Sequence, residues 1–346
     1  KTPEGINRIF YTICGSTAVE TAIKIAIAYH RAKGDSKRFR FVGRERGYHG
    51  MNIGATTVGG MINNVKTFAS VLMPGVQHMR HTHLPEHKFI KGQPDTGVEM
   101  AEDLERIAMN FGGENIAACI VEPIAGSTGT LVPPKGYLKR IREICDKHGI
   151  LLIFDEVITG WGRTGSAFAS QEFGVTPDMI TMAKATTNGV IPMGVVAVKE
   201  EMYDAVLDSA KNPEGTPELF HGYTYSGIPA AVAAGLAVQD IFDKEDIFIR
   251  AKEMSPYFQD GLQSLKDLKE VVSIRGYGMM GGIEMRMKEK PGKSGFQTFK
   301  HCYDAGVNFK NTGDTLIIAP QFICEKKHID EIIEKLRTGI SNYSKS

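Results

Sequence analysis

Residues 151–157 read LLIFDEV, an apolar run that ends in two carboxylates, Asp155 and Glu156. A continuous apolar run of this length predicts a strand over residues 150–154 that is buried on both faces of a parallel sheet. Downstream, residues 179–189 read MITMAKATTNG, in which Lys184 is the only charged residue. These two stretches determine both the fold and the chemistry that we expect.

Strand and helix patterns alternate on both sides of this run, which predicts an α/β fold with a mostly parallel central sheet flanked by helices. Ligands of such sheets bind beyond the carboxyl ends of the strands. Glu122, Asp155 and Lys184 all follow expected strands. The expected strands span residues 38–43, 116–121, 150–154, 177–183 and 194–198, and the expected helices span 17–32, 98–111 and 135–148.

The chain has 346 residues, which is too many for one hydrophobic core to grow comfortably. We therefore predict two domains, a large one over residues 1–243 and a smaller C-terminal α+β domain over residues 244–346. Helical patterns flank the boundary near Lys244, at residues 227–242 and 243–268. In the small domain we expect strands at 271–274, 280–285 and 316–319, and helices at 295–305 and 327–342.

The composition is that of an ordinary globular protein, with 42% hydrophobic and 23% charged residues and a net charge of +1. It therefore gives no indication of nucleic acid or a membrane surface as a partner. No apolar run reaches a membrane-spanning length. We expect no signal peptide. The five cysteines form no CxxC motif, so we expect free thiols and a cytoplasmic location: Cys14, Cys119, Cys145, Cys302 and Cys324.

Asp155 and Lys184 together are the pair that a pyridoxal phosphate (PLP) enzyme requires. The lysine forms a Schiff base with the cofactor, and the aspartate keeps the pyridinium nitrogen protonated. Burial would lower the pKa of Lys184 and so provide the neutral amine. Each residue alone also has an ordinary interpretation, since Asp155 could cap the next loop and Lys184 could extend its amine to water.

Two further stretches are consistent with a phosphate-bearing aromatic ligand. Gly15, Ser16 and Thr17 precede a helix, where small residues allow backbone N–H groups to approach a phosphate. The alternative is a plain helix cap, because Ser and Thr are common at that position. Tyr48 could stack on an aromatic ring, although an ordinary core tyrosine is the alternative.

Four histidines lie close together in the chain and raise the question of a metal site: His78, His81, His83 and His87. No cysteine or acidic residue nearby completes a convincing set of ligands. We therefore expect no structural metal.

In order along the chain, these motifs resemble the class III (omega) aminotransferases of PLP fold type I, and the resemblance covers nearly the whole sequence. Any one motif is weak, but the ordered set is specific. The motifs are GSTAVE at 15–20, RERGYHG at 44–50, VEPI at 121–124, FDEVITG at 154–160, GRTG at 162–165, MAK at 182–184 and YTYSG at 223–227.

The resemblance implies a role for each site residue. Lys184 would bind the cofactor covalently and move the proton, and Asp155 would bond the pyridine nitrogen. Thr224 would reach the phosphate of the neighbouring subunit, which implies a homodimer with shared active sites, possibly paired into a tetramer. The other implied cofactor residues are Gly15, Ser16 and Thr17 at the phosphate, Val157 and Tyr48 on the two ring faces, His49, and Glu122 beside the ring and the substrate pocket.

Within the class, residues 44–50, HTHLP at 81–85 and TGDT at 312–315 are most similar to the omega-amino acid:pyruvate enzymes. The family often places an arginine for the substrate carboxylate just before TGDT, and here Lys310 takes that position. A lysine is a point charge without the planar fork that matches a carboxylate. We therefore favour taurine as the amino donor and pyruvate as the acceptor, with beta-alanine second. Other class III activities, 4-aminobutyrate or ornithine-type, are the alternative.

A second departure lies at the start of the sequence, because relatives carry a long segment before the phosphate-binding helix. This chain begins just short of that helix, so we expect that the segment is missing. The rival interpretations are another PLP chemistry on the same fold, such as an aminomutase or decarboxylase, and a truncated binding protein without catalysis. The retained Lys184, Asp155 and Thr224 argue against the latter, since buried charges are costly without a cofactor.

Overall fold

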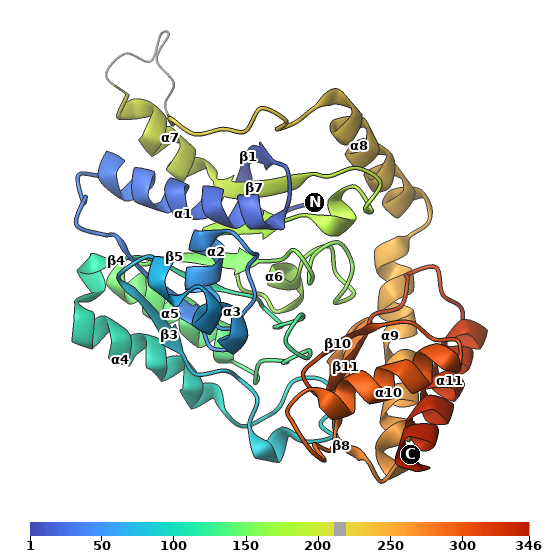
Figure 1. Ribbon diagram of the computed structural model, residues 1–346. Coiled ribbons are helices and arrows are strands. Elements are labelled where there is room, and N and C mark those ends of the chain that lie inside the picture. Colours follow the sequence, from blue (N-terminus) through green and yellow to red (C-terminus); the bar gives the residue numbers. More distant parts are fainter. Residues whose placement is uncertain (211–218, 346) are drawn as a thin grey trace.

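The computed structural model describes residues 1–210 and 219–345, and a seven-stranded sheet forms the centre of its larger part (Figure 1). Its strand order is β1-β7-β6-β5-β4-β2-β3. The run at residues 151–157 supplies β5, in the middle of the sheet, and Asp155 is its last residue. The strands are β1 (Ile6–Thr12), β2 (Arg40–Arg44), β3 (Val76–Met79), β4 (Ile116–Val121), β5 (Leu151–Asp155), β6 (Met179–Met182) and β7 (Gly194–Lys199).

Five neighbouring strands, β6, β5, β4, β2 and β3, pair in parallel. This confirms the predicted mostly parallel sheet. The two exceptions lie at one edge, where β7 runs antiparallel to both β6 and β1. We did not predict β1, β3 or the direction of β7. A strand's residue pattern reports burial rather than direction, and β1 exposes most of its residues as an edge strand.

Helices cover both faces of the sheet, and the side chains of β5 alternate between the two resulting cores. Leu151 and Ile153 pack with α1 (Gly15–Ala32), whereas Leu152 and Phe154 pack with α4 (Glu102–Phe111) and α5 (Tyr137–His148). This arrangement explains why the strand is apolar at every position. Shorter helices complete the domain: α2 (Ile53–Val58), α3 (Ile62–Thr67), α6 (Ala169–Glu172) and α7 (Glu200–Asp208).

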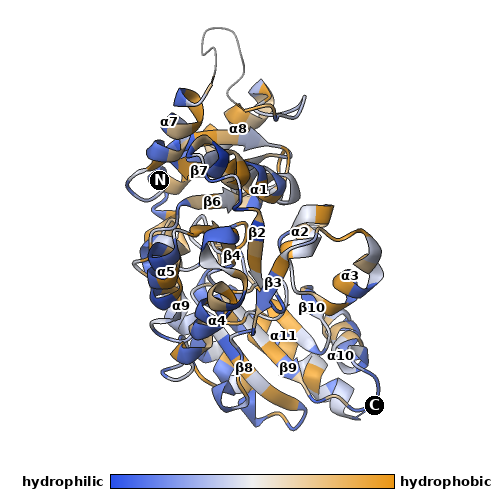
Figure 2. Ribbon diagram, turned by 90° about the vertical axis from the view of Figure 1, so that its left-hand side faces the viewer, coloured by the Kyte–Doolittle hydropathy of each residue, from blue (hydrophilic) through white to orange (hydrophobic). Residues whose placement is uncertain are grey.

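The C-terminal part forms a second, antiparallel sheet with its own hydrophobic core, in the order β10-β11-β9-β8. Figure 2 shows this unit below the large sheet, with hydrophobic residues along its strands. Its elements are α9 (Ile247–Gln263), β8 (Val271–Tyr277), β9 (Met280–Met285), α10 (Lys293–Asp304), β10 (Lys310–Thr312), β11 (Thr315–Ile318) and α11 (Lys326–Lys345).

The helix α8 (Pro229–Lys244) precedes this unit and ends at the residue where we place the domain boundary, which stays a prediction. Two expected helices are shorter than predicted. Residues 98–101 form a 3-10 turn before α4, and α9 begins only at Ile247, after Asp246 in a left-handed conformation. Across residues 1–210 and 219–345, no helix has both the length and the apolar character needed to cross a membrane.

Gly194, the first residue of β7, packs closely against the residue that precedes α1. A Cβ atom at Gly194 would overlap the carbonyl oxygen of Cys14. We expect Gly194→Ala to lower the free energy of unfolding by about 1–3 kcal/mol, because overpacking forces the backbone to shift. Gly222→Ala is the matched control, since no atom lies within 4 Å of a Cβ there. Equal unfolding midpoints in denaturant for both variants would contradict this packing.

Candidate active site

A cavity of about 350 Å³ opens at the carboxyl ends of β4, β5 and β6, beside the first turn of α1. Parallel strands bring the loops that follow them to one edge of the sheet, so residues distant in sequence meet there. The cavity brings together most of the residues predicted for the site: Gly15, Ser16, Tyr48, His49, Glu122, Asp155, Val157 and Lys184. Thr17 and Thr224 do not line it.

The Asp155 carboxylate is held in place at both of its oxygens. Nδ1 of His49 lies 2.8 Å from Oδ2, and the backbone N–H of Val157 donates to Oδ1 at 3.1 Å. Asp155 and His49 are only 4% and 3% exposed. Because a carboxylate only accepts hydrogen bonds, Nδ1 carries the proton in this contact. Nε2 of His49 is buried and has no hydrogen-bond partner among the described residues.

Lys184 follows β6 directly and begins a 3-10 turn, with a left-handed φ of 43°. Lys184 lines the cavity and, taken as a whole residue, is exposed. The surrounding protein still removes enough water to lower the pKa of Lys184. The carboxylates of Asp155 and Glu122 oppose this effect, and the charge of Lys310 adds to it.

Glu122 also lines the cavity and bridges two loops. Its Oε1 accepts the N–H of Tyr48 at 2.9 Å, and its Oε2 accepts the N–H of Gly126 at 2.9 Å. Burial raises the pKa of Glu122 and outweighs the influence of His49 and these two donors. The loop that carries Tyr48 and His49 is thereby tied to the end of β4.

The three residues predicted to bind the phosphate at the start of α1 make different contacts. The hydroxyl of Thr17 accepts the N–H of Cys14 at 3.0 Å and lies 2.9 Å from the Cys14 carbonyl oxygen, so it caps the helix. Gly15 and Ser16 face the cavity instead. A Cβ atom at Gly15 would come within 3.1 Å of the Val157 side chain. Because Gly15 and Ser16 line the cavity, the N-terminal end of this 18-residue helix faces it, as the binding of an anion there would require.

Lys184 also borders a second cavity, of about 520 Å³, which reaches to the antiparallel sheet. Lys310 and Arg163 line it as well, and among the described residues no Asp or Glu does. The ammonium of Lys310 lies 5.8 Å from the centre of the Tyr48 ring, between the two cavities. The second cavity is therefore strongly cationic.

The sequence reasoning missed two arginines, one buried and one partly buried, that support these walls. Arg44 is 1% exposed and donates to the carbonyl of Glu122 at 2.7 Å. Arg163 donates to the carbonyls of Met279 and Pro320 at 2.7 and 2.8 Å. Both lie in motifs that we had noted. Arg44 directly follows the strand expected over residues 38–43, and Arg163 lies in a Gly-rich turn; these positions were the available signal.

The four histidines make separate contacts instead of facing one point. His78 contacts the backbone carbonyl of Gly59 at 2.8 Å, and His87 contacts that of Thr96 at 3.0 Å. His81 accepts the N–H of His83, which in turn contacts Arg275. Over the described part of the chain, no group of three or more His, Cys, Asp or Glu side chains is arranged to hold a metal ion.

Comparison with known proteins decides the family. The sequence profile named Aminotransferase class-III matches residues 1–340. The chain belongs to the class III aminotransferases. This confirms the predicted family and enzyme class, and with them PLP as the cofactor on which the class depends.

The relatives of this class III aminotransferase match nearly its whole length. It is 51% identical to the "Omega-aminotransferase" of Caulobacter vibrioides over 97% of this chain and 76% of that protein. It is 42% identical to the "Beta-alanine--pyruvate aminotransferase" of Pseudomonas aeruginosa over 98% and 75%, respectively. The crystal structure of an omega transaminase from Pseudomonas jessenii in complex with PMP superposes with a TM-score of 0.92, at 28% identity, over 99% and 76%.

The first cavity of this aminotransferase fits PLP by its chemistry. It offers a lysine amine, a fixed carboxylate and a helix N-terminus, which match the aldehyde, the ring nitrogen and the phosphate of the cofactor. Val157 and Tyr48 add apolar and aromatic surface on the wall. Thr224 lies in an exposed turn outside this cavity.

The opposing influences on Lys184 predict the effect of removing one carboxylate. Because the charge of Asp155 favours the protonated amine, Asp155→Asn should move the pKa of Lys184 still further below its ordinary value. The pH dependence of Lys184 acylation by acetic anhydride in cofactor-free protein, followed by peptide mass spectrometry, measures this. Asp146→Asn removes a carboxylate on the exposed side of α5 and should leave the midpoint unchanged. A midpoint that stays or rises in Asp155→Asn would contradict the assignment.

Proposed function

We propose that the protein transfers the terminal amino group of an omega-amino acid to pyruvate, giving an aldehyde and alanine. The observation that carries this proposal is the position of Lys184, whose amine borders both the cavity that fits the cofactor and the cationic cavity beside it. The names of the relatives from Caulobacter vibrioides and Pseudomonas aeruginosa support the same activity.

When bound, PLP supplies an electron sink for the carbon that bears the transferred nitrogen. In our proposal, Asp155 binds the ring nitrogen, and His49 and the N–H of Val157 keep its carboxylate in one orientation. Lys184 holds the cofactor and moves the proton at the substrate carbon, which its lowered pKa favours. Gly15 and Ser16 bind the phosphate, Thr17 shapes the helix end, and Glu122 keeps Tyr48 against the ring.

Lys310 would bind the anionic end of the donor. It lines the same cavity as Lys184, beside the Tyr48 ring, and no Asp or Glu among the described residues lines that cavity. The carboxylate of pyruvate would bind at the same point. A tetrahedral sulfonate does not need the planar fork of an arginine, so we favour taurine as the donor, with beta-alanine second.

We further propose a homodimer with shared active sites. Thr224 lies in an exposed turn, and its side chain is free to contact a second subunit. In the dimer this hydroxyl would donate to the phosphate at the partner's first cavity, adding to the helix N-terminus there.

The donor preference is tested with purified enzyme, PLP and pyruvate, by measuring alanine formation. We expect the highest kcat/KM for taurine, then beta-alanine, then 4-aminobutyrate. Turnover of beta-alanine without taurine would reject the sulfonate preference alone. The absence of alanine formation from all three donors would reject the proposed function.

Exchanging the cation at position 310 should change the preference in a defined direction. Lys310→Arg introduces the fork that matches a carboxylate, so we expect the ratio of kcat/KM for beta-alanine over taurine to rise about fivefold, corresponding to about 1 kcal/mol. Lys300→Arg, on α10 and outside both cavities, is the control. An unchanged ratio in Lys310→Arg would show that Lys310 does not bind the donor's acid group.

A further inference from the structure

The loop over residues 126–130 lies between the cofactor-side cavity and the small domain. Its first residue, Gly126, donates its N–H to Glu122, and Gly126 and Ser127 line the second cavity. A pair of backbone hydrogen bonds between Ala125 and Leu131 closes the loop at its base. Any displacement of this loop therefore moves both the Glu122 contact and the wall of the second cavity.

Three successive carbonyl groups of this loop each accept a hydrogen bond from a different element. The hydroxyl of Thr312, on β10, donates to Ser127 at 2.8 Å. Arg46, after β2, donates to Thr128 at 3.0 Å, and Arg275, on β8, donates through Nε to the third carbonyl, that of Gly129, at 2.7 Å. Two of the three donors thus belong to the small domain.

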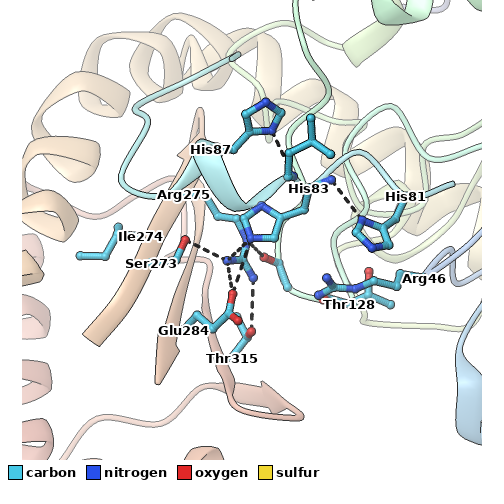
Figure 3. A network of polar contacts seen from close by, with 12 residues as sticks. Arg46, His81, His83, His87, Thr128, Ser273, Ile274, Arg275, Glu284 and Thr315 are labelled. Carbon is cyan, nitrogen blue, oxygen red and sulfur yellow. Dashed lines mark hydrogen bonds and ion pairs between the residues drawn. The ribbon is translucent and has the colours of Figure 1, made fainter. Parts of the chain in front are cut away.

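Arg275 is the most buried of these donors, at 3% exposed. Its Nη1 donates to Glu284 on β9 at 2.7 Å, and its Nη2 donates to Thr315 on β11 at 3.2 Å. Figure 3 shows the guanidinium between these groups, with the ring of His83 directed toward it. A guanidinium has five N–H donors in a rigid fork, so these bonds fix its position relative to the small sheet.

His83 completes this network from the large domain. Burial, followed by the charges of Arg275 and Arg46, lowers the pKa of His83 to about 3. The ring is therefore neutral near pH 7, and its Nε2 accepts from Nη1 of Arg275 at 3.5 Å. Arg275 consequently touches the large domain at two points, the Gly129 carbonyl and His83.

The packing around Gly129 leaves little freedom for this contact to rearrange. Gly129 has a φ of +120°, and a Cβ atom there would lie 2.8 Å from Nη2 of Arg275. A Cβ atom at Gly282, on β9, would lie 2.6 Å from the Gly129 carbonyl oxygen. The loop is therefore in close contact with the small sheet on two sides, which only glycines permit.

We infer that Arg275 is a positioning residue for the reaction, which holds the loop over residues 126–130 so that Glu122 and the wall of the second cavity keep their working geometry. It acts together with Thr312, which lies two residues from Lys310 on the same strand. The small domain that carries Lys310 is thereby connected to the cofactor side through the loop. This inference rests on the proposed roles of Glu122 and Lys310.

The test compares Arg275→Lys and Thr312→Val with a control arginine. Arg38 donates to the carbonyls of Gly113, Ile116 and His148. It lies just before β2, at the amino ends of the strands, whereas both cavities lie beyond the carboxyl ends. Arg38→Lys therefore removes similar contacts away from both cavities. For each variant we would measure the thermal unfolding midpoint, the Kd for PLP, and kcat and KM for beta-alanine and taurine.

We expect Arg275→Lys to lower kcat/KM by roughly ten- to a hundredfold and to raise the Kd for PLP, since small displacements of a site wall have effects of that size. Thr312→Val should change both quantities in the same direction, and Arg38→Lys should lower only the unfolding midpoint. If Arg275→Lys and Thr312→Val retain the wild-type Kd for PLP and kcat/KM, the inference is overturned. If the wild type binds PLP but turns over neither donor, the proposed function fails, and the Kd for PLP still decides the role of Arg275.

Discussion

The fixed carboxylate of Asp155 is the constraint on which the rest of the site depends. A carboxylate that is 4% exposed is costly unless hydrogen-bond donors and a cation surround it. His49 and the N–H of Val157 supply the donors, and in our proposal the protonated ring nitrogen of PLP supplies the cation. The two apolar cores on either side of β5 hold the strand so that this oxygen pair reaches the cavity.

The second organising feature is the loop over residues 126–130, which contacts both the edge of the cofactor-side cavity and the antiparallel sheet. It contacts Glu122 on one side and Arg275 and Thr312 on the other. The proposed cofactor site and the proposed donor site therefore share one wall. A substrate that binds at Lys310 would stabilise the same domain contact on which the position of Glu122 depends.

Much of this arrangement was predictable from sequence, because strand ends and Gly-rich turns are local signals. The apolar run before Asp155 predicted β5, and the carboxylate at its end predicted that the site lies at the carboxyl ends of the strands. The direction of β7 and the edge strand β1 were not predicted, since residue pattern reports burial and not orientation. The cap made by Thr17 is a local contact with Cys14 and was one of the two interpretations of that stretch. The Arg275 network depends on contacts between distant segments, which no local pattern encodes.

The most direct test of the account is whether PLP becomes linked to Lys184. Protein loaded with PLP should show an absorbance band near the edge of the visible range, and borohydride should abolish it. Mass spectrometry of the reduced protein should then find the cofactor on the peptide that contains Lys184, and Lys184→Ala should show neither the band nor the label. A label on another lysine, such as Lys310, or a band that persists in Lys184→Ala would contradict the central claim.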